Sequence, residues 1–150
     1  NPKTIAETSY QNTQYVHQGW FDKTQRFFIL GDELDEFRLG GKTRTLVFDL
    51  NDLDNPVLHH TYYGPTAAID HNGYVVEDLF YLANYSAGIR VIDIGGLADK
   101  NMKEIGFFDT FPEHNSTVFN GAWNVYPFFE SGVIAISDIN RGLFLIKKSE

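Results

Sequence analysis

Residues 79–94 read LFYLANYSAGIRVIDI, in which two runs of apolar, aromatic and β-branched side chains flank the tripeptide SAG at 86–88. Such runs favour β-strands, and a glycine between them permits the positive φ that many hairpin turns require. The pattern returns as VIAISDINRGLFLIK at 133–147, and an earlier copy joins FFILGDELDE at 27–36 to TRTLVFDL at 43–50. Three hairpins of one kind in 150 residues predict a protein built from repeats.

The repeats have a period of 52 to 54 residues. YLAN at 81–84 aligns with AISD at 135–138 at an offset of 54, and ILGD at 29–32 aligns with YLAN at an offset of 52. Gly88 aligns with Gly142, again at an offset of 54. This period, with strand-type patterning inside it, is typical of the blades of a β-propeller.

The predicted fold is all-β, a partial β-propeller of about three four-stranded antiparallel blades. The expected parts are an outer strand at 3–9, a blade at 14–63, a blade at 67–111 and an incomplete blade at 122–147. Three blades do not close a ring, since propellers use about four to eight. We therefore expect part of a larger ring, completed by the remainder of a parent propeller or by a second copy, and self-association of the isolated chain.

The strands themselves are expected at 14–20, 26–33, 43–50, 57–63, 67–74, 79–85, 88–94, 103–111, 122–126, 132–137 and 142–147. The segment 37–42 is expected to be an exposed hairpin loop. The segment 95–103 shows no apolar stripe of helical period, so it is expected to be a loop with at most a short 3₁₀ turn.

Charge and composition exclude several classes of partner. The net charge of −8 argues against nucleic acid and anionic membranes, which favour basic surfaces. No apolar run approaches the ~20 residues of a transmembrane helix. The chain has no cysteine, which excludes disulfides and thiolate metal sites. Any signal peptide of a secreted parent protein is expected upstream of these residues.

The densest polar cluster is GDELDE, which contains Asp32, Glu33, Asp35 and Glu36. On a strand, Glu33 and Asp35 would share one face while Asp32 and Leu34 share the other. Clustered carboxylates suit Ca²⁺ or another divalent cation, so the cluster is a candidate metal site. The alternative is a solvated strand end whose acidic side chains keep the edge soluble.

Two histidines occupy equivalent places in successive repeats. His17 aligns with His71, and Trp123 takes that place in the third repeat. Two imidazoles beside a central channel could bind a transition metal or an anion. The alternative is a structural role, in which each histidine hydrogen-bonds one blade to the next. His59 and His60 are adjacent on an outer strand and face opposite ways, so no shared metal is predicted there.

Aromatic side chains are expected at the ends of the inner strands, namely Trp20, Tyr74, Trp123 and Tyr126. They are typical of inter-blade core, and they could also stack on a sugar or an apolar ligand. The candidate ligand-binding residues at the channel mouth are His17, Trp20, His71, Tyr74 and Trp123.

Three aspartates recur at the ends of strands, Asp49, Asp93 and Asp138. A carboxylate at such a place accepts backbone N–H bonds in the turn that follows. The repetition predicts this architectural role for all three.

Segments spread over nearly the whole chain resemble one protein family: HQGWF from His17, ILGDELDE from Ile29, TRTLVFDLNDLDNPVL from Thr43, GPTAAIDHNGYV from Gly64, YLANYSAGIRVIDI from Tyr81, FNGAWNVYPFFESG from Phe119 and SDINRGLFLI from Ser137. The family is choice-of-anchor B, whose members carry LVIVD-type β-propeller repeats. The resemblance implies a bacterial protein that is secreted or displayed on the cell surface, with this chain as its C-terminal portion. Where the family pattern has a cysteine before HQGW, this chain has Val16. The resemblance implies no established activity.

Two functions therefore compete. The first is a non-enzymatic, extracytoplasmic propeller that binds or scaffolds an unidentified protein or carbohydrate, since no nucleophile elbow, HExxH or phosphate loop occurs. The second is a metal-dependent hydrolase with a divalent cation in the channel. Its ligands would come from His17, Asp32, Glu33, His71, Asn84 and Asp138. Propellers host both functions, so the fold alone does not decide.

Overall fold

The computed structural model describes residues 1–149 and contains three antiparallel sheets. The first sheet comprises β1 (Val16–Phe21), β2 (Phe27–Asp32), β3 (Arg44–Asp49) and β4 (Val57–Tyr63). The second sheet comprises β5 (Gly73–Val76), β6 (Leu79–Ala83), β7 (Ile89–Gly96) and β8 (Asn101–Phe108). The third sheet comprises β9 (Ala122–Tyr126), β10 (Val133–Asp138) and β11 (Gly142–Lys147). In each sheet, neighbouring strands are consecutive in sequence. The all-β prediction is confirmed.

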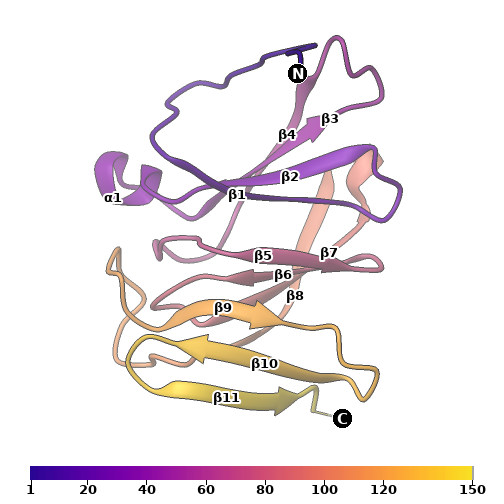
Figure 1. Ribbon diagram of the computed structural model, residues 1–150. Helices are drawn as coiled ribbons and strands as arrows, with labels where there is room; N and C mark the ends of the chain where they lie inside the picture. The colour runs from indigo at the N-terminus through magenta and orange to yellow at the C-terminus, as the bar shows by residue number, and fades with distance from the viewer. Residues whose placement is uncertain (150) are drawn as a thin grey trace.

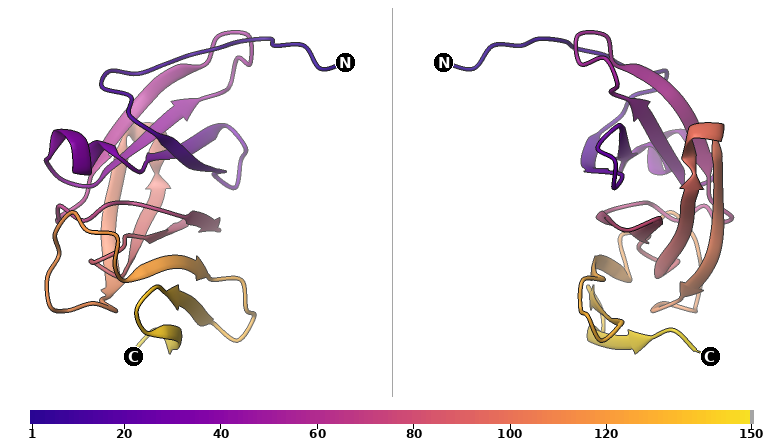
Figure 2. Two further views of the ribbon diagram at one scale, coloured as in Figure 1. Left: turned by 60° about the vertical axis from the view of Figure 1, so that its left-hand side comes forward. Right: turned by 90° about the vertical axis from the view of Figure 1, so that its right-hand side faces the viewer.

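The three sheets follow one another along the molecule in chain order (Figure 1). Their first strands are neighbours, because β1 contacts β5 and β5 contacts β9. Figure 2 shows the same succession from two further sides. Residues that start equivalent sheets are therefore brought side by side, although about 50 residues of chain separate them.

The hairpin predicted at 79–94 forms as β6 and β7, which pair from Leu79 with Asp93 to Ala83 with Ile89. Gly88 has a φ of 71° in the connecting turn, where its N–H donates to the Tyr85 carbonyl at 2.9 Å. The other two predicted hairpins are also confirmed, as the antiparallel pairs β2–β3 and β10–β11.

The hydrophobic core lies between the sheets, in two clusters. The first joins the first and second sheets through Phe27, Ile29, Val47, Val75, Phe80, Leu82, Ile92, Ile94, Leu97 and Met102. The second joins the second and third sheets through Ala83, Ile89, Ala122, Val125 and Ile136. The second sheet contributes to both clusters, because successive strand side chains point to opposite faces. This explains why β5 and β6 are nearly continuous in apolar residues.

Four segments test the finer sequence predictions. The expected loop at 95–103 contains the 3₁₀ turn η1 (Leu97–Asp99), as predicted. Residues 3–9, expected as an outer strand, form no strand, because no neighbouring strand pairs with them. The strand expected from residue 67 begins only at Gly73. The segment 37–42 is expected to be a hairpin loop, but residues 37–39 belong to the short helix α1 (Asp35–Leu39).

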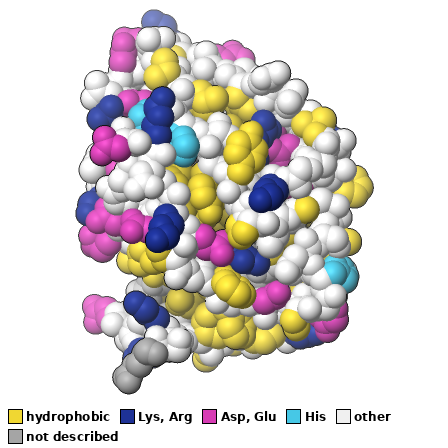
Figure 3. Space-filling model, turned by 180° about the vertical axis from the view of Figure 1, so that it is seen from behind, with side chains coloured by type: hydrophobic (Ala, Val, Ile, Leu, Met, Phe, Trp, Pro, Cys, Tyr) yellow, Lys and Arg dark blue, Asp and Glu magenta, His cyan; other side chains and the backbone are white. Residues whose placement is uncertain are grey.

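The side of the molecule opposite to the view of Figure 1, where β4 and β8 lie, mixes acidic, basic and hydrophobic side chains (Figure 3). Hydrophobic side chains of modest number on a surface are ordinary. Among residues 1–149, no helix has the length and apolar composition needed to cross a bilayer.

Candidate functional site

The equivalent residues His17, His71 and Trp123 form a row of rings in contact, which we call the histidine row; the two imidazoles are stacked and the Trp123 ring is tilted by 45° to that of His71. The ring centroids of His17 and His71 are 4.2 Å apart, and those of His71 and Trp123 are also 4.2 Å apart. His17 lies on β1, His71 lies just before β5 and Trp123 lies on β9. The row forms because these three strands are neighbours.

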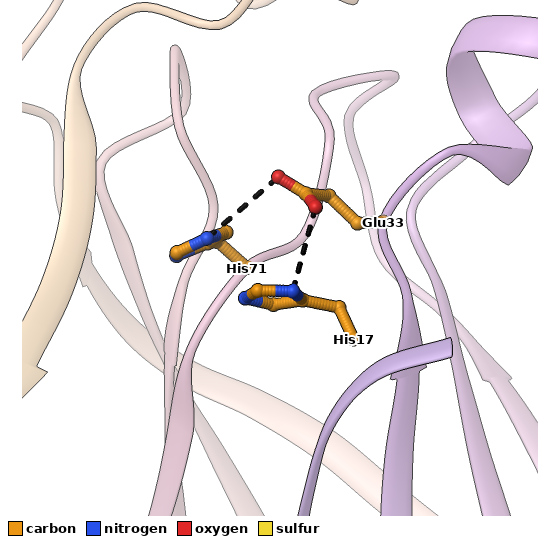
Figure 4. Close-up of side chains that lie close together, drawn as sticks. All are labelled: His17, Glu33 and His71. Carbon is orange, nitrogen blue, oxygen red and sulfur yellow. Dashed lines mark ion pairs between the residues drawn. The ribbon is translucent and has the colours of Figure 1, made fainter. Parts of the chain in front are cut away.

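Glu33, which directly follows β2, turns its carboxylate toward both imidazoles (Figure 4). Its Oε2 lies 3.5 Å from His17 Nδ1, and its Oε1 lies 3.7 Å from His71 Nε2. One donor atom from each of the three residues lies within 4.8 Å of the other two. In the part of the chain that the structure describes, no other group of three His, Asp or Glu side chains meets in this way.

His71 is held in one protonation state by its surroundings. Its Nδ1 lies 2.6 Å from the Trp123 carbonyl oxygen, which can only accept, so Nδ1 carries the proton. The side chain is buried, and burial lowers the pKa of His71 although the Trp123 carbonyl acts in the opposite direction. The imidazole is therefore neutral at pH 7, with its Nε2 lone pair directed toward Glu33.

Tyr85 is a member of the site that the sequence analysis missed. Its hydroxyl donates to Glu33 Oε1 at 2.6 Å, and its ring packs against both His71 and Trp123. Burial and the bond to Glu33 raise the pKa of the Tyr85 phenol, so it remains a donor. The one sequence signal for its role is that a large tyrosine lies in a turn whose next three residues, Ser86, Ala87 and Gly88, are small.

The four carboxylates of GDELDE do not form one metal-binding group, because Asp32 and Asp35 both lie against Arg44 whereas Glu33 faces the histidines. The expected alternation of Glu33 and Asp35 on one strand face is wrong, because β2 ends at Asp32 and α1 begins at Asp35. Asp32 is buried and accepts hydrogen bonds from Gln14 N and Tyr15 N, each at 2.7 Å. Asp32 therefore holds the segment that leads into β1 in place. Of the four carboxylates, Glu33 alone lies against the histidines.

Asp35 and Glu36 are buried, so the alternative of a solvated strand end is also wrong. Arg44 Nε donates to Asp35 Oδ2 at 2.5 Å, and the Arg44 backbone N–H donates to Glu36 Oε1 at 2.8 Å. Burial raises the pKa of Glu36 to about 10, and the neighbouring charges of Asp70 and Asp35 act in the same direction. Glu36 therefore carries a proton at neutral pH.

Glu36→Gln should stabilise the protein above pH 5, by about 3 kcal/mol at pH 7, because the folded carboxyl keeps its proton over the roughly 2.5 pH units between its ordinary pKa and pH 7. The wild-type carboxyl is protonated in both states well below its ordinary pKa of 4.5, and above that value only the unfolded chain loses the proton. Wild-type stability therefore falls as pH rises toward 10, whereas the amide has no such cost. Urea unfolding at pH 4.5, 7 and 9 measures the difference. A gain that does not grow with pH would contradict it.

A second row of equivalent residues, the aromatic row, comprises Trp20, Tyr74 and Tyr126. All three contact the ring of Phe128, with centroid separations of 6.3, 5.9 and 5.3 Å. Trp20 also meets Tyr74 edge to face at 5.0 Å. The five residues predicted as one channel-mouth group are therefore divided: Trp20 and Tyr74 lie in the aromatic row, and Trp123 lies with the histidines.

A cavity of about 380 Å³ opens beside the aromatic row. Trp20 and Val75 line it together with polar groups of Asp22, Gln25 and Glu77. Trp20 is 40% exposed, Tyr126 49% and Phe128 40%. Aromatic faces thus remain available to a ligand at this place.

The recurring aspartates adopt the predicted architectural role. Asp49, Asp93 and Asp138 each accept a backbone N–H from the residue two positions on, at 2.9, 2.8 and 2.8 Å. Asn84 occupies the place of Asp138 one repeat earlier but acts as a donor. Its Nδ2 donates to the carbonyls of Ala68 and Ile69, both at 2.9 Å.

Comparison with known proteins found no matching family model and no matching curated protein.

Proposed function

We propose that the three sheets are successive blades of a larger β-propeller, and that the protein works as an extracytoplasmic binding module. The observation that carries this proposal is the convergence of residues 52 to 54 positions apart into two rows on neighbouring first strands. A unit repeated about a common axis would give such rows. The third sheet has three strands where the others have four, which agrees with an arc completed by the remainder of a parent propeller or by a second copy.

The resemblance to choice-of-anchor B proteins supports a bacterial, secreted or cell-surface location for this module. The same resemblance assigns no ligand, so the ligand class must come from the chain itself. We place the binding surface at the aromatic row and its adjacent cavity.

The aromatic row favours a neutral carbohydrate as the ligand. Trp20 and Tyr126 offer partly exposed rings on which the apolar face of a sugar can pack. The cavity beside Trp20 falls in the size range of small-molecule sites, about 300–1,000 Å³. Gln25 and Glu77 border it and supply acceptors and donors for hydroxyl groups, whereas both carboxylate oxygens of Asp22 already accept from Phe27 and Thr24.

The chain provides its own reporter for this site, because Trp20 and Trp123 are its two tryptophans. In a Trp123→Phe protein, only Trp20 fluoresces in the tryptophan range. Titration with cello-, chito-, xylo- and mannohexaose should give a saturable change of this emission with at least one sugar. Tyr126→Ala in the same background should weaken that binding ~5-fold or more, since stacking on an aromatic ring contributes about 1 kcal/mol or more.

Tyr63→Ala is the matched control, because Tyr63 is a 61% exposed tyrosine on β4 outside both rows. It should leave the affinity unchanged. Constant Trp20 emission with all four sugars would exclude the aromatic row as a carbohydrate site.

A metal-dependent hydrolase is the second candidate, and the meeting of His17, Glu33 and His71 is the observation that favours it. The other residues considered for its metal have structural partners. Asp32 and Asp138 accept backbone N–H groups, and Asn84 donates to backbone carbonyls.

A further inference from the structure

We infer that His17, Glu33 and His71 form a binding site for one divalent transition-metal ion of the Zn²⁺ class. The inference goes beyond the carbohydrate-binding module, and it supplies what the hydrolase candidate requires. It depends on three side chains and on neither the propeller nor the aromatic row. Four features of the described residues support it.

The donor atoms suit a transition metal rather than the Ca²⁺ expected for the acidic cluster. Two imidazole nitrogens and one carboxylate oxygen are the donor set of many zinc, iron and manganese sites, whereas Ca²⁺ and Mg²⁺ prefer oxygen ligands alone. Glu33, moreover, is the one acidic residue of its cluster that lies against both histidines.

The spacing of the donors is close to what such an ion needs. Tetrahedral bonds of about 2.0–2.1 Å place neighbouring donors roughly 3.3 Å apart. The two distances from Glu33 oxygens to histidine nitrogens are 3.5 and 3.7 Å. All three donors lie within 4.8 Å of one another, and because the two imidazole rings are stacked, a turn of the partly exposed His17 ring would be needed to direct both nitrogens at one ion.

His71 presents a lone pair that has no other use. Its side chain is 2% exposed, and its Nε2 has no hydrogen-bond partner. A buried polar atom without a partner is unfavourable, and such atoms often mark the place of an ion or water. The bond from Nδ1 to the Trp123 carbonyl matches the support that metal-bound histidines usually have on the opposite ring nitrogen.

The remaining two ligands are oriented and accessible. Tyr85 fixes the Glu33 carboxylate through its hydroxyl, which leaves further lone pairs of that carboxylate free. The His17 side chain is 27% exposed, so an ion can enter from solvent. Three protein ligands leave a fourth position for water or a ligand, as in catalytic zinc sites.

A simple ion pair is the competing explanation, because both separations lie within the roughly 4 Å of an ion pair. Neither histidine nitrogen is within normal hydrogen-bond distance of Glu33, since the separations exceed about 3.2 Å.

The test uses the untagged chain with Trp20→Phe, in which Trp123 is the only tryptophan. Its ring lies 4.2 Å from that of His71, so a paramagnetic ion at the site should quench it strongly. Titration with Co²⁺ should quench Trp123 with one equivalent and should produce visible absorption bands of a four- or five-coordinate ion. Zn²⁺ should displace Co²⁺ and restore the fluorescence, whereas Ca²⁺ and Mg²⁺ should not.

His17→Ala and Glu33→Gln should each weaken Co²⁺ binding at least ~10-fold. Glu33→Gln retains an oxygen that can accept from Tyr85, and His17 is partly exposed, so both variants should fold; far-UV circular dichroism verifies this. His114→Ala removes an exposed histidine elsewhere and should leave the affinity unchanged. Absence of saturable quenching, or equal affinity in all variants, would overturn the inference. Trp20 and Trp123 report the two sites separately, so this result is independent of the carbohydrate test.

Discussion

Gly88→Ala should destabilise the protein by about 3 kcal/mol or more, one of the largest effects expected from adding a single methyl group. Gly88 has a φ of 71°, which side-chain-bearing residues adopt at a cost. An added Cβ would also overlap the Phe108 carbonyl oxygen and would lie 2.6 Å from the Asp109 Cα. Because these are backbone atoms of β8 and its exit, the clash cannot be relieved by a side-chain rotation.

Gly142 is the matched control, since it lies 54 residues later at the equivalent turn. Its φ is 84°, yet nothing lies within 4 Å of an added Cβ. Gly142→Ala should therefore show only the backbone cost, about 1 kcal/mol. Urea unfolding followed by circular dichroism gives both values. Losses of similar size in the two variants would show that β8 does not constrain the turn as described.

Asn84→Asp should destabilise the protein by about 3–5 kcal/mol at pH 8, although the side chain hardly changes shape. Asn84 is buried, and its Nδ2 donates to the carbonyls of Ala68 and Ile69. A carboxylate cannot donate, so the Ile69 carbonyl would lose its side-chain donor, the Ala68 carbonyl would keep only the Thr43 hydroxyl, and a negative charge would be buried. The charge is the larger part of the expected effect.

The pH dependence of Asn84→Asp isolates the contribution of the charge. Burial raises the folded-state pKa of the introduced carboxyl, so its penalty is smallest below the ordinary pKa and grows as pH rises. Unfolding at pH 4 and pH 8 should therefore show a smaller loss at the lower value. Asp138→Asn is the matched control, because an amide oxygen can still accept from Asn140 N; it should change stability by about 0.5 kcal/mol or less. A pH-independent loss in Asn84→Asp would contradict the assigned role.

The strands were predictable because their signals are local. The segments 57–63, 122–126 and 142–147 have the predicted bounds, since each is an apolar, β-branched or aromatic run closed by turn residues. The alignment of His17 with His71 and Trp123 also anticipated that the three residues would be neighbours. Equivalent residues of stacked repeats meet whenever the first strands are adjacent, which the period alone implies.

The remaining features depend on contacts between distant residues. Residues 67–72 look like a strand, yet the Ala68 and Ile69 carbonyls bond to the Asn84 side chain rather than to a neighbouring strand. The GDELDE segment looks solvated, but Arg44 and the fold around it bury Glu36. Neither partner can be inferred from local composition.

The two histidines of the candidate metal site could be predicted from the sequence, but Glu33 could not, because its contact with them is also one between distant residues. The period brings His17 to His71, but Glu33 was assigned to the acidic cluster because its sequence neighbours are carboxylates. Glu33 reaches the histidines because the chain turns after β2, and the same turn separates Glu33 from Asp35. Tyr85, which fixes Glu33, reaches it from the next sheet across 52 residues of sequence.

Asn84 donates hydrogen bonds and Asp138 accepts them, although the two residues occupy equivalent places. This difference limits how the two hairpins can be exchanged between sheets in evolution or in design. The two hairpins share their backbone course, yet one requires a donor at this place and the other an acceptor. A chimera that grafted residues 133–147 onto the second sheet would bring a carboxylate against the Ala68 and Ile69 carbonyls. Viable recombinants should therefore transfer the preceding segment 67–72 together with its hairpin, so that the inherited module is longer than the visible strands.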